Sequence, residues 1–268
     1  MTGRSSLTFL KLGGSLITDK TRPHTPRLGV LTRLAEEIAR ACRENPGLQI
    51  ILGHGSGSFG HVPAKMHSTR LGVNTPQEWS GFVEVWREAW QLNQLVMQAL
   101  AGAGLPALAF APLPSLLAEG GDVLAWNLEP IELALKAGLL PVIYGDVVFD
   151  RRLGGTILST ENLFEHLATH LLPERILLAG LEAGVWADFP TCSRRIERIS
   201  PHNWHEIQPA LSGSSATDVT GGMLSKVETS LVLTQRIDGL EVRIFSGNDS
   251  GSVYQALMGS KVGTLICA

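Results

Sequence analysis

The feature that most constrains the fold is an alternation of short apolar runs, typical of buried strands, with longer segments of helical periodicity. Seven runs predict strands, at residues 8–12, 48–52, 107–110, 140–143, 175–179, 242–245 and 264–267. The segments between them predict helices at 31–41, 77–103 and 160–171, and a β-hairpin at 147–157. Chains with this alternation form a parallel sheet covered by helices. We therefore expect an α/β protein.

Composition excludes several classes of protein. The 268 residues are 44% hydrophobic and 18% charged, with a net charge of −3, which excludes a disordered or fibrous chain. No run of five Lys or Arg residues occurs, so we expect neither nucleic acid nor a membrane surface as a partner. Cys42, Cys192 and Cys267 suggest no disulfide framework and no zinc site. With no apolar stretch long enough for a signal peptide or a membrane span, we expect a cytoplasmic protein.

Three glycine-rich segments each follow a predicted strand or open a predicted helix. At such places unpaired backbone N–H groups and the helix dipole favour anions. The segments are Lys11-Leu-Gly-Gly-Ser15, Gly53-His-Gly-Ser-Gly-Ser-Phe-Gly-His61 and Asp218-Val-Thr-Gly-Gly-Met-Leu-Ser-Lys226. Together they predict a phosphate-binding site.

The second segment has an alternative interpretation. Gly55, Gly57 and Gly60 match the Gly-x-Gly-x-x-Gly pattern of dinucleotide-binding folds. That pattern requires a helix that opens at once and an acidic residue about 20 positions on. Pro63 and Gly72 are expected to interrupt the helix here, which disfavours a dinucleotide-binding oxidoreductase. Saturable NAD binding without ATP binding would support it.

The order and spacing of the motifs resemble the isopentenyl phosphate kinases of the amino acid kinase superfamily. The resemblance covers residues 7–266 and adds Lys20 and Gly145-Asp-Val-Val-Phe-Asp150 to the glycine segments. It implies a three-layer αβα sandwich with a mainly parallel central sheet. It also implies transfer of the ATP γ-phosphoryl group to isopentenyl phosphate with Mg²⁺. A homodimer formed through an amino-terminal lobe of residues 1–172 is implied as well, with nucleotide bound on a carboxy-terminal lobe of residues 173–268.

The resemblance assigns roles to charged residues. It implies that Lys20 and Lys226 stabilise the transferring phosphoryl group and that Lys11 bridges the donor and acceptor phosphates. His61 would donate to the acceptor phosphate, although a loop histidine bonded to a carbonyl is the structural alternative. Asp146 would hold the lysines in place by ion pairing, or else cap a turn. No histidine pattern suggests a metal site held by the protein.

The remaining site residues surround these charges. The groups expected at the nucleotide and its phosphates are Gly13, Gly14, Ser15, Gly57, Gly180, Gly184 and Gly222. The residues expected at the acceptor are Ser56 and Gly145 for its phosphate and, on the predicted helix 77–103, Phe82 and Trp86 for its hydrocarbon tail. In Trp86→Ala we expect a change in the preferred tail length.

Three departures from the family pattern fall near the nucleotide. Thr160-Glu161-Asn162 stands where Thr-Asp is usual, Trp186 replaces a tyrosine, and Phe189 is an extra residue between Asp188 and Pro190. The nearest alternative function is therefore another kinase of the superfamily, acting on a phosphonate or an amino-acid carboxylate.

Overall fold

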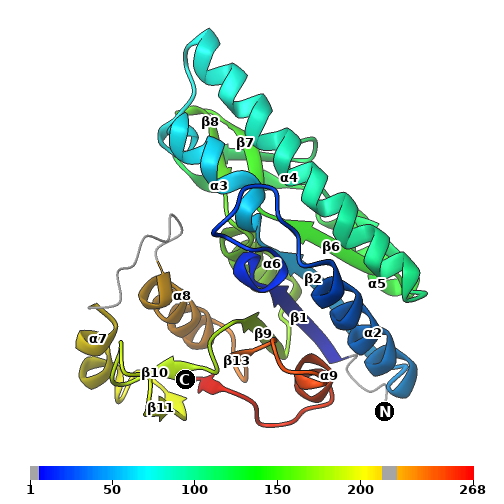
Figure 1. The fold of residues 1–268 in the computed structure, drawn as a ribbon, viewed down its shortest axis with the longest axis vertical. Helices are drawn as coiled ribbons and strands as arrows, with labels where there is room; N and C mark the ends of the chain where they lie inside the picture. The colour runs from blue at the N-terminus through cyan, green and yellow to red at the C-terminus, as the bar shows by residue number, and fades with distance from the viewer. Residues whose placement is uncertain (1–5, 213–221) are drawn as a thin grey trace.

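A computed structural model describes residues 6–212 and 222–268 of the chain (Figure 1). Its central feature is an eight-stranded sheet within these residues. In spatial order the strands are β12 (Arg198–Ile199), β14 (Thr264–Ile266), β13 (Glu241–Ser246), β9 (Arg175–Gly180), β1 (Ser6–Leu12), β2 (Leu48–His54), β6 (Leu140–Tyr144) and β3 (Ala107–Ala109). Every neighbouring pair is parallel except β13 and β14. All seven predicted strands lie in this sheet, which confirms the expected α/β class.

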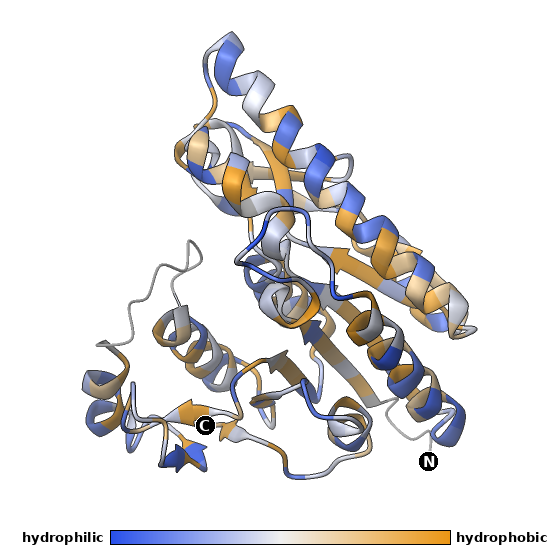
Figure 2. Ribbon diagram, viewed as in Figure 1, coloured by the Kyte–Doolittle hydropathy of each residue, from blue (hydrophilic) through white to orange (hydrophobic). Residues whose placement is uncertain are grey.

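Helices cover both faces of the sheet. They are α1 (Gly14–Ile17), α2 (Leu28–Glu44), α3 (Gly57–Met66), α4 (Pro76–Gly102), α5 (Glu129–Lys136), α6 (Thr160–Leu171), α7 (Trp204–Ser212), α8 (Gly222–Arg236) and α9 (Ser252–Leu257), with a 3₁₀ turn η1 (Thr69–Leu71). Side chains of β1 alternate between the two faces, because Phe9 belongs to the core under α5, α6 and α8, and Leu10 to the core under α2, α4 and α9. Figure 2 shows the apolar strands between the two helical layers. The predicted three-layer sandwich is therefore confirmed.

The predicted hairpin belongs to a second, smaller sheet. Strands β7 (Asp146–Asp150) and β8 (Gly154–Leu158) form the hairpin, and β4 (Leu116–Glu119) and β5 (Asp122–Trp126) extend it to four strands. The sequence analysis did not predict β4 and β5. The Asp150 carboxylate joins the two hairpins, since it accepts hydrogen bonds from the backbone N–H groups of Gly120 and Gly121 at 2.9 and 2.8 Å. A further pair, β10 (Val185–Trp186) and β11 (Arg195–Ile196), lies near α7.

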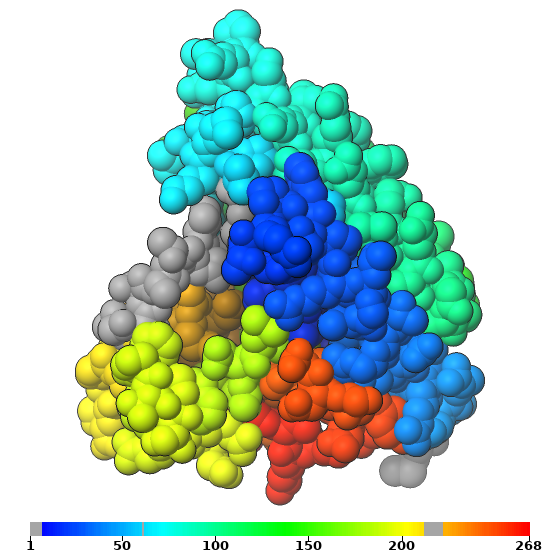
Figure 3. Space-filling view, in the orientation of Figure 1, coloured from blue at the N-terminus to red at the C-terminus, as the bar shows by residue number. Residues whose placement is uncertain are grey.

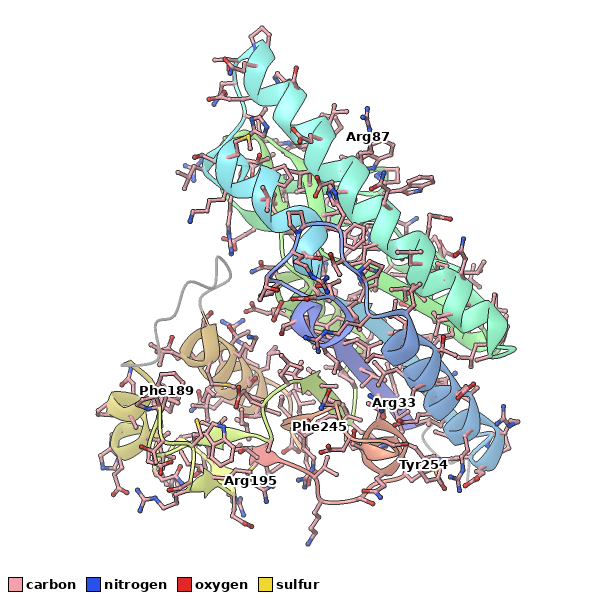
Figure 4. The ribbon with its side chains drawn as sticks, viewed as in Figure 1. Arg33, Arg87, Phe189, Arg195, Phe245 and Tyr254 are labelled. Atoms are coloured by element: carbon pink, nitrogen blue, oxygen red, sulfur yellow. The ribbon has the colours of Figure 1, made fainter. Side chains whose placement is uncertain are left out.

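The main sheet crosses the expected boundary between the lobes. The first strand after residue 173 is β9, which pairs with β1 on one side and with β13 on the other. A polar junction between α2 and α9 also joins the two halves (Figure 4). There the Arg33 guanidinium donates to the Gly247 carbonyl at 2.7 Å, and the Glu37 carboxylate accepts from the N–H groups of Val253 and Tyr254 at 2.9 and 3.1 Å.

Helix α3 differs from its prediction. It begins at Gly57, within the second glycine segment, and includes Pro63. The proline ring removes one backbone N–H, but the helix continues for one more turn, and the Pro63 carbonyl accepts from His67 N–H at 2.9 Å. The expectation that Pro63 interrupts the helix was therefore wrong. No helix in residues 6–212 and 222–268 is long and apolar enough to cross a membrane.

Candidate active site

A cavity of about 390 Å³ lies at the carboxyl ends of the central strands. Ligands of parallel α/β sheets bind at this edge, where strands end and helices begin. Twelve of the residues expected at the site line the cavity: Lys11, Gly13, Gly14, Ser15, Lys20, Ser56, Gly57, Gly145, Asp146, Gly180, Gly222 and Lys226. Segments that are far apart in the sequence thus supply its walls.

The first two glycine segments touch through their backbones. Gly55 N–H donates to the Leu12 carbonyl at 3.1 Å, and a Cβ atom on Gly14 would lie 2.5 Å from the Gly57 nitrogen. Gly57 itself has a φ of 53°, and a Cβ there would lie 2.1 Å from the Thr18 hydroxyl oxygen. Glycine is therefore required at both positions by close approach and by backbone conformation.

A methyl group at position 14 tests this contact. We expect Gly14→Ala to cost about 1–3 kcal/mol of stability, because the two loops must separate. It should also lower kcat/KM by about 10²-fold, since groups that position the phosphates move with the loops. Urea unfolding and steady-state kinetics measure the two effects.

Gly29→Ala is the matched control for that substitution. Nothing lies within 4 Å of a Cβ built on Gly29, which is in α2. Alanine there should add about 0.5 kcal/mol of stability and leave activity unchanged. Equal behaviour of the two variants would contradict the proposed backbone contact.

Lys11 forms an ion pair with Glu161 at the centre of the cavity. Lys11 is the penultimate residue of β1 and is 8% exposed, and Glu161 lies in the first turn of α6. Burial raises the pKa of Glu161, but the Lys11 and Lys226 ammonium groups outweigh it and bring that pKa below its usual value. Glu161 is thus the carboxylate that faces two of the three expected lysines.

Asp146 does not occupy the expected ion-pairing position. One oxygen, Oδ1, accepts a hydrogen bond from Val147 N–H at 2.8 Å, whereas Oδ2 is buried and has no partner among the described residues. Burial raises the pKa of Asp146 to about 8. The sequence analysis missed Glu161 as the partner of Lys11, although it noted that the acidic residue there differs from the usual aspartate.

Lys20 lies on a loop, residues 18–27, that is attached to α3 and α4. Thr25 N–H donates to the Ser58 hydroxyl at 3.1 Å, and His24 Nε2 lies 2.8 Å from Glu88 Oε1. The Asp19 carboxylate stabilises the loop from inside, since hydrogen bonds from Thr21 lower the pKa of Asp19 to about 2. In Figure 3 this dark blue segment lies at the surface against the cyan of α3. The loop therefore presents Lys20 to the cavity from a fixed support.

Two parts of the expected site lie outside the described residues. The backbone of His61 belongs to α3, one turn after Gly57, but its side chain is not described. Residues 218–221 of the third glycine segment are not described either, and the description resumes at Gly222, where α8 begins.

Three expected residues do not line the cavity. Phe82 is 4% exposed and packs against Trp79 and Phe149 in a separate cluster. Trp86 is 36% exposed on the outer side of α4. Gly184 lies against β14, where a Cβ would be 2.6 Å from the Thr264 hydroxyl oxygen. Phe82 and Trp86 were expected at the cavity because the sequence does not show which side of α4 faces it. In the structure Phe82 is buried in a separate cluster and Trp86 lies on the outer side of the helix.

Other apolar side chains take their place. At the end of the cavity beside α3 and α4 the apolar lining residues are Ala64, Val85, Ala89 and Ile157, and Arg70 of η1 lines this end as well. At the opposite end they are Leu181, Trp186, Phe189, Leu211 and Met223. The Trp186 indole N–H donates to Glu182 Oε2 at 2.8 Å, and Figure 4 shows Phe189 near α7. Each end of the cavity is thus mainly apolar but has one charged residue, Arg70 at the first and Glu182 at the second, and the lysines lie between the two ends.

Comparison with known proteins agrees with this arrangement. The model of the amino acid kinase family matches residues 6–246. The chain is 34% identical to the isopentenyl phosphate kinase of Methanocaldococcus jannaschii over 97% of this chain and 98% of that one. It is 33% identical to the isopentenyl phosphate kinase of Methanothermobacter thermautotrophicus over 95% and 96%. X-ray structures of isopentenyl phosphate kinase give a TM-score of 0.81 at 29% identity, over 97% of this chain and 99% of the other.

The chain therefore belongs to the amino acid kinase family. It is a phosphotransferase, and the oxidoreductase suggested by Gly55, Gly57 and Gly60 is excluded. Within the family, the chain groups with the isopentenyl phosphate kinases along nearly its whole length.

Proposed function

We propose that this enzyme transfers the γ-phosphoryl group of ATP to isopentenyl phosphate. An oxygen of the acceptor phosphate attacks the γ-phosphorus, the bond from that phosphorus to the β,γ-bridging oxygen breaks, and isopentenyl diphosphate and ADP leave. One observation carries the proposal: Lys11, Lys20 and Lys226, from three distant segments, line one cavity beside two glycine segments. Such a cluster neutralises the charge of two neighbouring polyanions.

The chemistry requires cations more than it requires a base. The second pKa of a phosphate monoester is about 6, so the attacking oxygen is mostly ionised at neutral pH. Catalysis then depends on positioning and on stabilising charge at the transferring group. In this proposal Lys20 and Lys226 contact the transferring group, Lys11 bridges the two phosphates, and His61 donates to the acceptor.

The two apolar ends suggest how the substrates are divided between the lobes. We place the nucleotide base at the end formed by Leu181, Trp186, Phe189 and Met223, all from residues 173–268. The acceptor tail then lies at the end formed by α3, α4 and β8, within residues 1–172.

Among the described residues no group of three acidic, histidine or cysteine side chains is placed to hold a metal ion. Mg²⁺ would therefore enter with the ATP phosphates, where it neutralises their charge.

A substrate panel tests the proposal. Wild-type enzyme is incubated with ATP, Mg²⁺ and either isopentenyl phosphate, a phosphonate or an amino-acid carboxylate, and ADP is measured. Fastest turnover of isopentenyl phosphate supports the proposal, and faster turnover of a carboxylate overturns it. His61→Ala should greatly raise KM for the phosphate acceptor, whereas a small effect favours a carboxylate acceptor.

The tail pocket makes a prediction about chain length. Val85 is 3% exposed and lines the cavity, so Val85→Ala enlarges the pocket by two methyl groups. We expect the preference for a five-carbon over a ten-carbon monophosphate, as a ratio of kcat/KM, to fall about tenfold. Trp86→Ala is the control and should leave the ratio unchanged, contrary to the expectation from sequence. An altered ratio in Trp86→Ala alone would contradict this pocket.

We also propose a homodimer formed through the amino-terminal lobe. Val83, Trp86 and Trp90 form an exposed stripe on α4, and they are 47%, 36% and 45% exposed. Beside α4 lies β3, an edge strand whose Leu108 is 46% exposed. Figure 4 shows Arg87 directed away from the molecule on this helix. A second copy would cover both the stripe and the open edge.

Trp90→Glu tests the dimer. A carboxylate that is buried and unpaired within the covered stripe is costly, so we expect a monomer at micromolar concentration by sedimentation velocity. Arg87→Glu, which changes a charge beside the stripe, is the control, and its mass by sedimentation velocity is compared with that of Trp90→Glu. An unchanged mass in Trp90→Glu would contradict this interface.

We also propose a reducing, cytoplasmic location. The three cysteines, Cys42, Cys192 and Cys267, form no disulfide bond with one another, which supports this proposal.

A further inference from the structure

Asp146 is a buried carboxyl group on the wall of the substrate cavity. It begins β7 at the junction with β6, and it is 1% exposed. The backbone beside it is fixed, because Gly145 N–H donates to the Thr160 hydroxyl at 3.0 Å, and that hydroxyl donates to the His54 carbonyl at 2.6 Å. Asp146 Oδ1 accepts a hydrogen bond from Val147 N–H, and Oδ2 has no hydrogen-bond partner among the described residues. Burying a polar atom without a hydrogen-bond partner costs free energy unless a bound group supplies the missing hydrogen bond.

The charges around this wall do not neutralise Asp146. Titratable and charged groups on the elements around it are Tyr144 on β6, Lys11 on β1, Lys20 on the 18–27 loop, Arg70 on η1, Glu161 on α6, Lys226 on α8 and, behind Tyr144, His54 on β2. Lys11 is paired with Glu161. Burial raises the pKa of Asp146 to about 8, and the one opposing contribution is the hydrogen bond from Val147 N–H. At pH 7 the carboxyl group is therefore mostly protonated.

We propose that Asp146 is an uncharged hydrogen-bond donor to the acceptor phosphate. Its Oδ2–H donates to a phosphate oxygen, directly or through one ordered water molecule. This inference rests on the proposed function and specifies the acceptor site. An ionised carboxylate at this wall would repel a dianion, whereas a protonated one adds a donor and leaves the lysines for the transferring group.

Asparagine separates this role from an ion-pairing role. In Asp146→Asn the amide oxygen can accept from Val147 N–H and the NH₂ group can donate, as the protonated acid does. We expect Asp146→Asn to keep kcat/KM for isopentenyl phosphate within about threefold at pH 7, and Asp146→Ala to lose about 10–100-fold. If Asp146 acted as a charged partner of the lysines, Asn and Ala would fail equally, and that result would overturn the inference.

The pH profile gives a second readout. In the wild type, kcat/KM should fall above pH 8 as Asp146 loses its proton, and in Asp146→Asn this alkaline decline should disappear. Identical alkaline limbs in the two proteins would overturn the inference. Loss of the proposed function itself is distinguishable, because the wild type would then release no ADP with isopentenyl phosphate at any pH.

Proton uptake tests the wild-type protein without turnover. Isopentenyl phosphate is titrated into the enzyme without ATP at pH 8.5, in two buffers of different ionisation enthalpy. A dianion near Asp146 raises its pKa further, so binding should take up roughly 0.5–0.8 proton in the wild type and none in Asp146→Asn. At this pH the phosphate is already a dianion and ordinary imidazoles are neutral, so neither contributes. Equal uptake by the two proteins would overturn the inference.

Stability supplies a check that does not depend on substrate. An aspartate whose pKa is raised by folding binds more protons in the native state, so its contribution to stability falls as pH rises from about 4 towards 8. Asn does not titrate. The Tm of Asp146→Asn should therefore exceed that of the wild type at pH 8 and approach it at pH 4. A lower Tm at pH 8 would indicate an ion-paired aspartate and overturn the inference.

Discussion

Methionine in place of Lys226 is expected to lower kcat by about 10²–10³-fold, with a much smaller change in KM for the acceptor. Lys226 lies one turn into α8, lines the cavity, and is close enough to Glu161 to lower the pKa of that residue. Methionine keeps the length of the side chain and removes its charge. The loss should therefore fall on stabilisation of the transferring phosphoryl group.

The control for this substitution is Lys136→Met. The Lys136 side chain is 72% exposed on α5 and pairs weakly with Glu132 at 3.9 Å. Its replacement should change kcat by less than about twofold, because exposed ion pairs contribute little. Single-turnover measurements with excess enzyme separate the chemical step from product release. A loss below fivefold in Lys226→Met would remove this lysine from the proposed mechanism.

Glu161→Gln should destabilise the protein and impair catalysis together. The substitution removes the negative charge of Glu161 from beside the Lys11 ammonium group, and the two side chains are only 10% and 19% exposed. Breaking such a pair from one side costs about 3 kcal/mol. Lys11 is then held less firmly in the cavity, and we expect kcat to fall by about 10²-fold. Urea unfolding at neutral pH measures the first effect.

The pH dependence of this loss has a definite sign. The pKa of Glu161 lies below its ordinary value of 4.5 in the folded protein, so the ion pair stabilises the fold above that value. Below it the contribution declines as the native carboxylate takes up a proton. The stability difference between the wild type and Glu161→Gln should accordingly be full at pH 7 and shrink below pH 4.5. Glu161→Asp keeps the charge and should recover most of the stability; equal loss in Asp and Gln would contradict the ion-pair explanation.

The sheet and the lysines and glycines that line the cavity could be predicted because strong local signals mark them. Buried parallel strands are apolar runs; β1 and β2 end within the first two glycine segments, and β9 ends at Gly180. Since the carboxyl ends of parallel strands meet at one edge, the lysines and glycines were expected together. Strands β4 and β5 escaped prediction because their pattern is short and half exposed.

Three details needed the three-dimensional structure. Helix α4 carries apolar residues around most of its circumference, so the sequence does not reveal that Val85 faces the cavity and Trp86 faces outward. Two acidic residues, Asp146 and Glu161, both follow strands, and only their surroundings show which one meets Lys11. Pro63 is a helix breaker by propensity, but tertiary packing of α3 overrides it.

The position of β1 between β2 and β9 fixes the distance between the loops that follow those two strands. Lys11 is aligned with Gly53 on one neighbour and with Leu178 on the other. Hydrogen-bonded strands lie about 4.8 Å apart, so the loops that follow β2 and β9 start about 10 Å from each other with this lysine midway. The hydrogen-bond ladder between the three strands holds that separation constant. In the proposed reaction, donor and acceptor would therefore meet at a spacing that is set by the sheet and not by a hinge between the lobes.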